Sequence, residues 1–135
     1  MSVYTRRAQY HETDRMGVIH HSNYIKWMEE ARTVRLEEMG INYASMEEAG
    51  ILSPFVSLSV DYRSPVRYWE DVEISVSVRR YTGVVLELSY EFVGASDGTL
   101  RAKAESRHCF LKDRSPVSLK KAMPEVHEKL MELVQ

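Results

Sequence analysis

Hydrophobic and polar residues alternate with a period of two along three stretches in the middle of the chain. This pattern is typical of β-strands that bury one face of a sheet. Turn-forming residues separate the stretches, notably Pro65, Gly83 and the segment 96–98. Two further strands are expected at 2–10 and at 99–111. The positions expected to face the core are Val56, Leu58, Val60 and Tyr62, then Val72, Ile74, Val76 and Val78, then Val84, Leu86, Leu88, Tyr90 and Phe92.

A helical pattern precedes these strands, because apolar residues three and four apart gather on one broad face. Either Ser22 or Asn23 is expected to cap the start of this helix. Gly40 suits the left-handed position that follows a last helical turn. Near the end of the chain, Pro124 can begin a short helix that runs to residue 134. The apolar face of the long helix comprises Tyr24, Trp27, Met28, Ala31, Val34 and Met39.

The order of elements is a strand, a long helix, four strands that can pair antiparallel, and a short helix. One apolar helix face has to be covered by one apolar sheet face. The simplest arrangement is an α+β fold in which a five-stranded antiparallel sheet wraps around the long helix. The length of 135 residues fits one domain, 1–135. A domain of this size buries roughly two-thirds of its unfolded surface, which is enough for a core.

Composition and charge narrow the classes of function. A net charge of -2 gives no reason to expect a nucleic acid or an anionic membrane as a partner. No apolar run approaches the ~18 residues of a membrane span, and the first ten residues lack the apolar segment of a signal peptide. The chain has one cysteine, Cys109, and therefore no disulfide of its own. We expect a cytoplasmic protein on these grounds.

Titratable side chains crowd into residues 11–21, immediately before the long helix. Asp14 is followed seven residues later by His21, with Gly17 between them. Backbone N–H groups at a helix start lack intrahelical partners and carry the positive end of the dipole. They can hold a carbonyl oxygen that gains negative charge during acyl transfer. A nearby carboxylate can attack that carbonyl or activate a water, and glycine allows a tight turn and a close approach of substrate.

Other interpretations of this stretch remain open at this point. Asp14 near a helix start is also explained as a favourable partner of the helix dipole. The three histidines, with Asp14 or Glu12, raise the question of a metal site. The adjacent pair His20-His21 lacks the i, i+4 spacing of helical zinc ligands, so no metal is expected. His11 and His20 are expected to be surface or partly packed residues, and no role in the chemistry is assigned to His20.

The stretch from Tyr10 to Arg32 resembles the opening of the hotdog-fold acyl-CoA thioesterases of the 4-hydroxybenzoyl-CoA thioesterase type. The family pattern is an aromatic residue, a short acidic stretch ending in Asp, two residues, Gly, two apolar residues and a Tyr-His or similar pair. An aromatic-rich helix with Glu-x-Ala-Arg follows. Residues 62–67 with Asp71 resemble the turn between the family's second and third strands. The matching residues are Tyr10, Glu12-Thr13-Asp14, Gly17, Val18-Ile19, His20-His21, Asn23-Tyr24 and Glu29-Glu30-Ala31-Arg32.

The resemblance implies a hotdog fold and hydrolysis of an acyl-CoA to a free acid and CoA, without a metal or organic cofactor. Asp14 would be the catalytic carboxylate, as nucleophile or general base. His21 would orient substrate or water, and its backbone N–H would polarise the thioester carbonyl. Glu12 stands where the family usually has Asp, and His20 where it usually has tyrosine. Both departures leave the preferred acyl group open.

Hotdog subunits generally pair so that two sheets become one, with active sites at the boundary. The edges of a five-stranded sheet can be covered in this way, so a homodimer or a homotetramer is expected. Gly17, Val18 and Tyr24 would lie at the substrate, with Val56 and Leu58 in the acyl pocket of the partner's site. The CoA phosphates need cations. The candidates are Arg63, Arg67, Arg79 and Arg80, with Arg101, Lys103 and Arg107 as further possibilities.

Three rival functions are distinguishable. A hotdog hydratase or dehydratase would carry an Asp-x-Asn-Pro-x-His type motif, which this chain lacks. A non-catalytic acyl-CoA binding module would not need Asp14, and a turnover assay separates the two. A metal hydrolase would lose activity to a chelator. The sequence does not indicate whether the acyl group is short, branched, aromatic or long.

Overall fold

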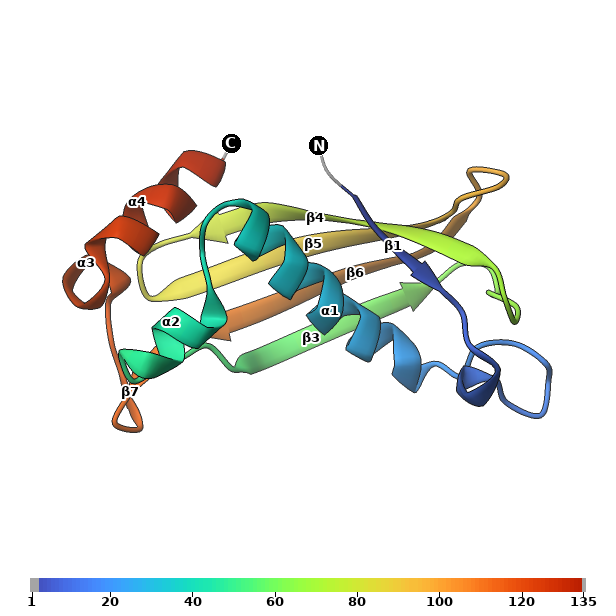
Figure 1. Ribbon diagram of the computed structural model, residues 1–135, viewed down its shortest axis with the longest axis horizontal. Helices are drawn as coiled ribbons and strands as arrows, with labels where there is room; N and C mark the ends of the chain where they lie inside the picture. Colours follow the sequence, from blue (N-terminus) through green and yellow to red (C-terminus); the bar gives the residue numbers. More distant parts are fainter. Residues whose placement is uncertain (1–2, 135) are drawn as a thin grey trace. The chain divides into compact units, whose positions relative to one another are not determined.

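The main β-sheet of the computed structural model has five strands, in the order β1-β4-β5-β6-β3 (Figure 1). The structure describes residues 3–134. Strand β1 pairs antiparallel with β4, with Tyr4 opposite Ile74. The strands are β1 (Val3–Arg7), β3 (Phe55–Tyr62), β4 (Asp71–Tyr81), β5 (Val85–Gly94) and β6 (Leu100–Cys109). The predicted α+β architecture with a five-stranded antiparallel sheet is confirmed.

The long predicted helix and the C-terminal helix are both present. Pro124 is the first residue of the C-terminal helix, as predicted, because its fixed φ suits a first helical turn. The helices are α1 (Ser22–Glu38), α2 (Tyr43–Glu48), α3 (Leu119–Ala122) and α4 (Pro124–Leu133), with a short 3-10 turn η1 (Tyr10–Glu12). No helix within residues 3–134 has the length and apolar character needed to cross a membrane.

A second, small sheet was not predicted. Its strands are β2 (Ile51–Leu52), β7 (Leu111–Lys112) and β8 (Ser115–Pro116), in the order β2-β7-β8. The two residues that join β7 to β8 both have positive φ, 52° at Asp113 and 65° at Arg114. This is the backbone of a type I′ turn, whose twist matches that of the flanking strands.

The chain divides into two compact units, and the main strands contribute residues to both. The first unit comprises residues 3–35, 60–76 and 90–104, and the second comprises residues 36–59, 77–89 and 105–134. The assignment of residues 1–135 to a single domain stays a prediction.

In the first unit, α1 packs on the sheet through aromatic residues. The ring centroid of Tyr24 lies 5.5 Å from that of Phe92 in β5 and 4.9 Å from that of Tyr62 in β3. Trp27, Met28 and Ala31 are fully buried, so this part of the predicted helix face is confirmed. Two other predictions about α1 are wrong.

Val34 is 37% exposed, because it lies at the margin of the apolar stripe, whereas Arg32 is buried. Neither Ser22 nor Asn23 precedes the helix, because α1 begins at Ser22 and both residues lie in its first turn. The side chain of Asn23 donates hydrogen bonds to backbone carbonyls instead of accepting one from a helical N–H.

In the second unit, β5 and α4 supply much of the core. Leu86, Leu88 and Leu130 are buried, and the hydroxyl of Tyr81 lies 2.7 Å from Nδ1 of His127 in α4. Gly40 has a φ of +82°, as its predicted position after the last turn of α1 requires.

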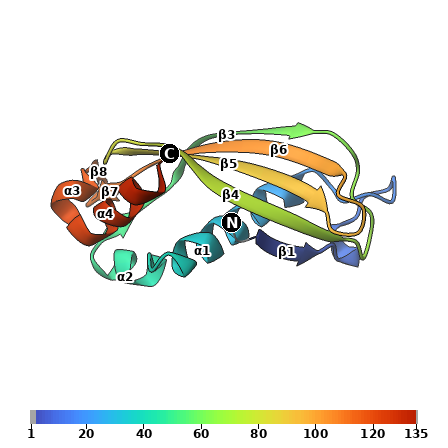
Figure 2. The same cartoon turned by 90° about the horizontal axis from the view of Figure 1, so that it is seen from above.

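The predicted buried face of β3 is largely exposed. Val56, Leu58 and Tyr62 are 57%, 39% and 46% exposed, because β3 is an outer strand of the sheet (Figure 2). Val84 is also exposed, since it lies in the turn before β5 and not in the strand. The other predicted core positions of β4 and β5 are buried, except for half-buried Val78.

Candidate active site

Asp14 lies in a tight loop that closes on itself. Its N–H donates to the carbonyl of Val18 at 2.9 Å, and the N–H of Gly17 donates to the carbonyl of Asp14 at 3.1 Å. Gly17 has a φ of +79°, a conformation that side-chain-bearing residues rarely adopt. One carboxylate oxygen of the half-buried Asp14 accepts the N–H of Met16 at 2.8 Å. These hydrogen bonds therefore restrict the rotation of the Asp14 carboxylate.

The far side of this loop is fixed to the segment between β3 and β4. The N–H of Ile19 donates to the carbonyl of Val66 at 2.8 Å, and both residues are buried. Val18, which is half-buried, forms an antiparallel bridge with Arg67. The connection 63–70 thus holds the end of the loop, residues 18 and 19, in place through backbone contacts.

The backbone N–H groups at the start of α1 differ in their hydrogen bonding. The N–H of His20 donates to the carbonyl of Glu12 at 2.8 Å, and that of Asn23 donates to the carbonyl of His20 at 3.0 Å. The N–H of Ser22 donates to Nδ1 of His20 at 3.2 Å. The N–H of His21 meets no acceptor among the residues that the structure describes. Of these four amides, that of His21 is available to an incoming oxygen.

The ring of His20 has a structural role that the sequence did not reveal. Its Nδ1 accepts the N–H of Ser22 and lies 2.8 Å from the hydroxyl oxygen of the same residue. It therefore satisfies one of the unpaired donors of the first helical turn, as a capping side chain does. The rings of His20 and His21 stack with centroids 4.1 Å apart.

Tyr62 is a site residue that sequence reasoning placed only in a strand face. Its hydroxyl donates to the carbonyl of His21 at 3.0 Å, and its ring packs edge-on against that of Tyr24. Burial raises the pKa of Tyr62, so the hydroxyl remains a donor at neutral pH. The one available signal was its position at the start of the segment 62–67.

Tyr24, predicted to lie at the substrate, is only 2% exposed in the single chain. Burial, followed by the nearby hydroxyl of Tyr62, raises the pKa of Tyr24 to about 12. Gly17 is exposed at the turn of the loop. The roles of these residues toward substrate stay predictions.

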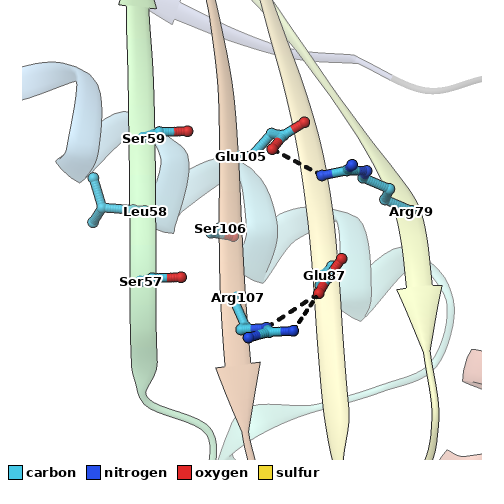
Figure 3. Close-up of a pocket in the computed structure, with 8 residues that line it drawn as sticks. All are labelled: Ser57, Leu58, Ser59, Arg79, Glu87, Glu105, Ser106 and Arg107. Carbon is cyan, nitrogen blue, oxygen red and sulfur yellow. Dashed lines mark hydrogen bonds and ion pairs between the residues drawn. The ribbon is translucent and has the colours of Figure 1, made fainter.

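Leu58 lines a hollow of about 370 Å³ in the second unit (Figure 3). The other lining residues are polar. Arg79 of β4 pairs with Glu105 of β6 at 2.8 Å, across the intervening strand β5. Glu87 accepts from Arg107 at 3.0 Å and from Arg80 at 3.4 Å. In the single chain this hollow is charged, which does not suit an acyl group.

The four cation candidates for CoA phosphates differ in their partners. Arg79 and Arg80 are paired with carboxylates, as just described, and Arg63 pairs with Asp61 at 2.7 Å. The side chain of Arg67 is exposed and has no carboxylate partner within residues 3–134. Its positive charge is therefore the least compensated of the four.

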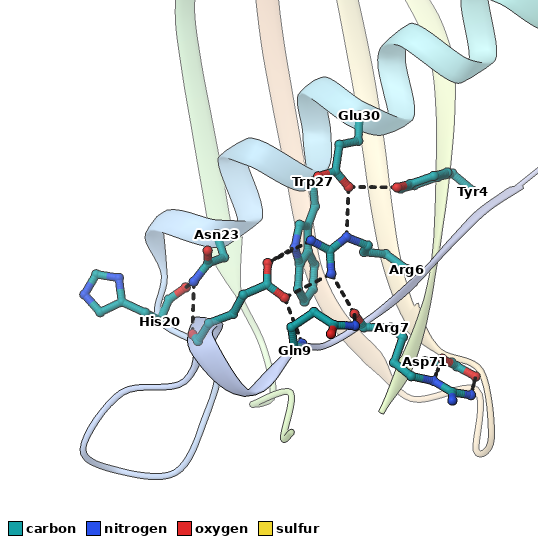
Figure 4. A network of polar contacts seen from close by, with 10 residues as sticks. Tyr4, Arg6, Arg7, Gln9, His20, Asn23, Trp27, Glu30 and Asp71 are labelled. Atoms are coloured by element: carbon teal, nitrogen blue, oxygen red, sulfur yellow. Dashed lines mark hydrogen bonds and ion pairs between the residues drawn. The ribbon is translucent and has the colours of Figure 1, made fainter. Parts of the chain in front are cut away.

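Glu12, two residues before Asp14, is 3% exposed and hydrogen-bonded on both carboxylate oxygens (Figure 4). Burial alone would raise its pKa. Hydrogen bonds from the N–H of Gln9 and from Trp27, together with the charge of Arg6, outweigh burial and lower the pKa. Glu12 is therefore an ionised carboxylate although it is buried, and the sequence did not reveal this burial. Within residues 3–134, no three His, Cys, Asp or Glu side chains gather as a metal site would require.

A family model described as the thioesterase-like superfamily matches residues 8–131. YneP of Bacillus subtilis (strain 168), which is named as an acyl-CoA thioesterase, is 35% identical over 122 residues, covering 89% of this chain and 88% of YneP. YbgC of Escherichia coli O157:H7, named as an acyl-CoA thioester hydrolase, is 27% identical over 99 residues, or 73% of each chain.

The crystal structure of the DHNA-CoA thioesterase from Staphylococcus aureus superimposes with a TM-score of 0.94 at 33% identity. The match covers 97% of this chain and 89% of that one. The chain therefore belongs to the thioesterase-like superfamily and is a hydrolase with the hotdog fold.

Proposed function

We propose that the protein hydrolyses an acyl-CoA thioester to a free acid and CoA. The observation that carries this proposal is that the N–H of His21, just before α1, meets no acceptor among the described residues and lies seven positions after Asp14, whose carboxylate is hydrogen-bonded within its own loop. The names of the similar proteins support CoA thioesters as the substrate class. The ring contacts of Tyr24 with Tyr62 and Phe92 pack the first turn of α1 against the sheet.

In the proposed reaction, the thioester carbonyl oxygen accepts the N–H of His21. Negative charge that develops on this oxygen is stabilised by that donor and by the positive end of the α1 dipole. Asp14 acts in one of two ways. As general base, it takes a proton from a water that attacks the carbonyl carbon; as nucleophile, it attacks that carbon itself.

The two routes differ in their intermediate and agree in their products. In the first, the tetrahedral intermediate collapses with cleavage of the C–S bond, and the CoA thiolate leaves and takes up a proton. In the second, cleavage of the C–S bond leaves an acyl-aspartyl anhydride, which water then hydrolyses. The imidazole of His21 is exposed next to the N–H donor and is proposed to position substrate or water.

A free-CoA release assay over a panel of short, branched, aromatic and long acyl-CoAs tests the proposal. We expect turnover of at least one member, and no loss of turnover when a chelator is added. Binding of acyl-CoA without release of CoA across the whole panel would support the non-catalytic binding module instead. Loss of activity to the chelator, with recovery on adding zinc, would indicate a metal hydrolase.

The protein is also proposed to act as a homodimer or homotetramer. The exposed apolar side chains of β3, Val56 and Leu58, support this, because an outer strand with such residues is otherwise open to uncontrolled pairing. In the assembly, Val56 and Leu58 would line the acyl pocket of the partner's site. Light scattering should show a dimer or a larger species, and a fully active monomer would contradict the shared site.

Of the cations, Arg67 is proposed to contact the CoA phosphates, since its exposed side chain forms no ion pair within residues 3–134. Arg67→Ala should raise the KM for an acyl-CoA while leaving the KM for the matching acyl-pantetheine unchanged. An equal rise for both substrates would place the contribution of Arg67 elsewhere.

A further inference from the structure

Four hydrogen-bond donors converge on the side chain of Glu12 (Figure 4). Nη1 and Nη2 of Arg6 lie 3.0 Å from Oε1 and Oε2, respectively. The N–H of Gln9 donates to Oε1 at 2.8 Å, and Nε1 of Trp27 donates to Oε2 at 2.9 Å. Paired donors of this kind hold a buried carboxylate in one orientation.

The backbone of Glu12 makes a second set of contacts, with the start of α1. Its carbonyl oxygen accepts the N–H of His20 at 2.8 Å and Nδ2 of Asn23 at 3.0 Å. The chain leaves Glu12 toward Asp14, passes through the loop, and returns to His20. The entry and the exit of the loop are therefore joined at this one residue. The N–H of His21, which meets no acceptor among the described residues, belongs to the residue that follows His20.

We propose that Glu12 is a positioning residue, which holds the carboxylate of Asp14 in register with the N–H of His21. It does not touch the substrate, because its oxygens are already occupied and its side chain is buried. The inference rests on the proposed function of Asp14 and His21. Displacing a reacting group by about 1 Å can cost on the order of a hundredfold in rate, so such positioning is measurable.

Replacing Glu12 with Gln disturbs this arrangement with little change in size. The four groups that contact the Glu12 carboxylate are all donors, two on each oxygen. The NH₂ group of a glutamine therefore has to face donors whichever way the amide is turned. One pair of contacts is lost, and the loop is free to shift relative to α1.

The chain contains a control for the loss of the Arg6 ion pair. Glu30 accepts Nε of Arg6 at 3.0 Å and the hydroxyl of Tyr4 at 2.8 Å, and neither of these hydrogen bonds reaches the loop. Glu30→Gln removes a negative charge that pairs with the same arginine and leaves Glu12, the link to the Asp14 loop, unchanged. A purely structural role for the Arg6 network would make the two variants behave alike in turnover.

The test is a cycle of Glu12→Gln, Asp14→Asn and the double variant, with Glu30→Gln beside it. Circular dichroism and thermal melts confirm folding, and kcat and KM are measured by CoA release at enzyme concentrations high enough for the Asp14→Asn background. We expect Glu12→Gln to lower kcat roughly ten- to a hundredfold with little change in KM. In the Asp14→Asn background it should cause no further loss, and Glu30→Gln should leave kcat near that of the wild type.

Asn23→Ala serves as a second variant if Glu12→Gln folds poorly. It removes the side-chain link to the Glu12 carbonyl while keeping the ion pair, so a smaller drop in kcat is expected, again absent without Asp14. Equal losses in both backgrounds, an unchanged kcat or a change confined to KM would overturn the inference alone. Full activity of Asp14→Asn would overturn the proposed role of Asp14 as the catalytic carboxylate, and the inference with it, while the proposed hydrolysis of acyl-CoA would stand.

Discussion

The hydroxyl of Tyr62 donates a hydrogen bond of 3.0 Å to the carbonyl oxygen of His21, so the last residue of β3 holds the residue that precedes α1. The N–H of Tyr24 donates weakly to the same carbonyl at 3.3 Å. The His21 residue is thus held on its carbonyl side while its N–H stays open. Strand β3 contributes to the site in this way within the first unit.

Tyr62→Phe removes only this hydroxyl. A single hydrogen bond contributes about 1 kcal/mol, so kcat/KM is expected to fall by about threefold to tenfold, and the melting temperature by only a few degrees. Tyr68→Phe is the matched control, because Tyr68 is an exposed tyrosine of the same unit with no hydrogen bond to the helix start. Identical kinetics for the two variants would show that the bond to His21 is not used.

The two adjacent histidines should separate into a structural and a catalytic role. His21→Ala is expected to lower kcat/KM roughly ten- to a hundredfold, while the backbone N–H of residue 21 survives. His20→Ala should lower the free energy of unfolding by about 1 kcal/mol, because Ser22 loses its capping acceptor. His20→Asn keeps an acceptor and should recover most of that loss. A larger kinetic effect at His20 than at His21 would mean that the chemistry uses the other histidine.

Gly17 should tolerate asparagine better than valine. A Cβ at this position would meet no neighbouring atom of residues 3–134 within 4 Å, so the cost of substitution comes from its φ of +79° and not from a clash with those residues. The left-handed conformation costs about 1–2 kcal/mol for ordinary residues, and less for asparagine. Gly17→Val should therefore lose more kcat/KM than Gly17→Asn. Equal activity in both variants would show that the loop accommodates the strain.

Arg114→Gly should stabilise the β7–β8 hairpin. Both residues of its turn have positive φ, and Asp-Gly is a favoured pair for a type I′ turn. Since a strained side-chain-bearing residue is removed, urea denaturation should show a gain of up to about 1 kcal/mol. A destabilised variant would mean that the arginine side chain contributes contacts that outweigh the strain.

The sequence predicted elements whose periodicity extends over several residues. The alternation in β4 and β5 and the stripe Tyr24, Trp27 and Met28 place their residues in the core as expected. The two-residue strands β2, β7 and β8 are too short to show a period, so they were missed. Alternation in β3 identified the strand and misassigned its exposure, because a pattern shows which residues share a face and not what covers that face.

At the site, the sequence identified the loop but not its supports. Glu12 looks like any acidic residue in a polar stretch, and its side-chain partners Arg6 and Trp27 lie in other elements, 6 and 15 positions away along the chain. The bond from Tyr62 to His21 spans 41 positions and leaves no local signal. The cytoplasmic location, the oligomeric state and the roles of individual residues toward substrate stay predictions.

Turnover of the Asp14→Asn variant tests the central claim most directly. Asparagine keeps the size of the side chain and can still accept the N–H of Met16, so the loop should hold its shape. It cannot attack the thioester or take a proton from water. With a normal circular dichroism spectrum and unchanged acyl-CoA binding, kcat for CoA release should fall by on the order of a hundredfold or more. Turnover close to that of the wild type would contradict the assignment of Asp14 as the catalytic carboxylate.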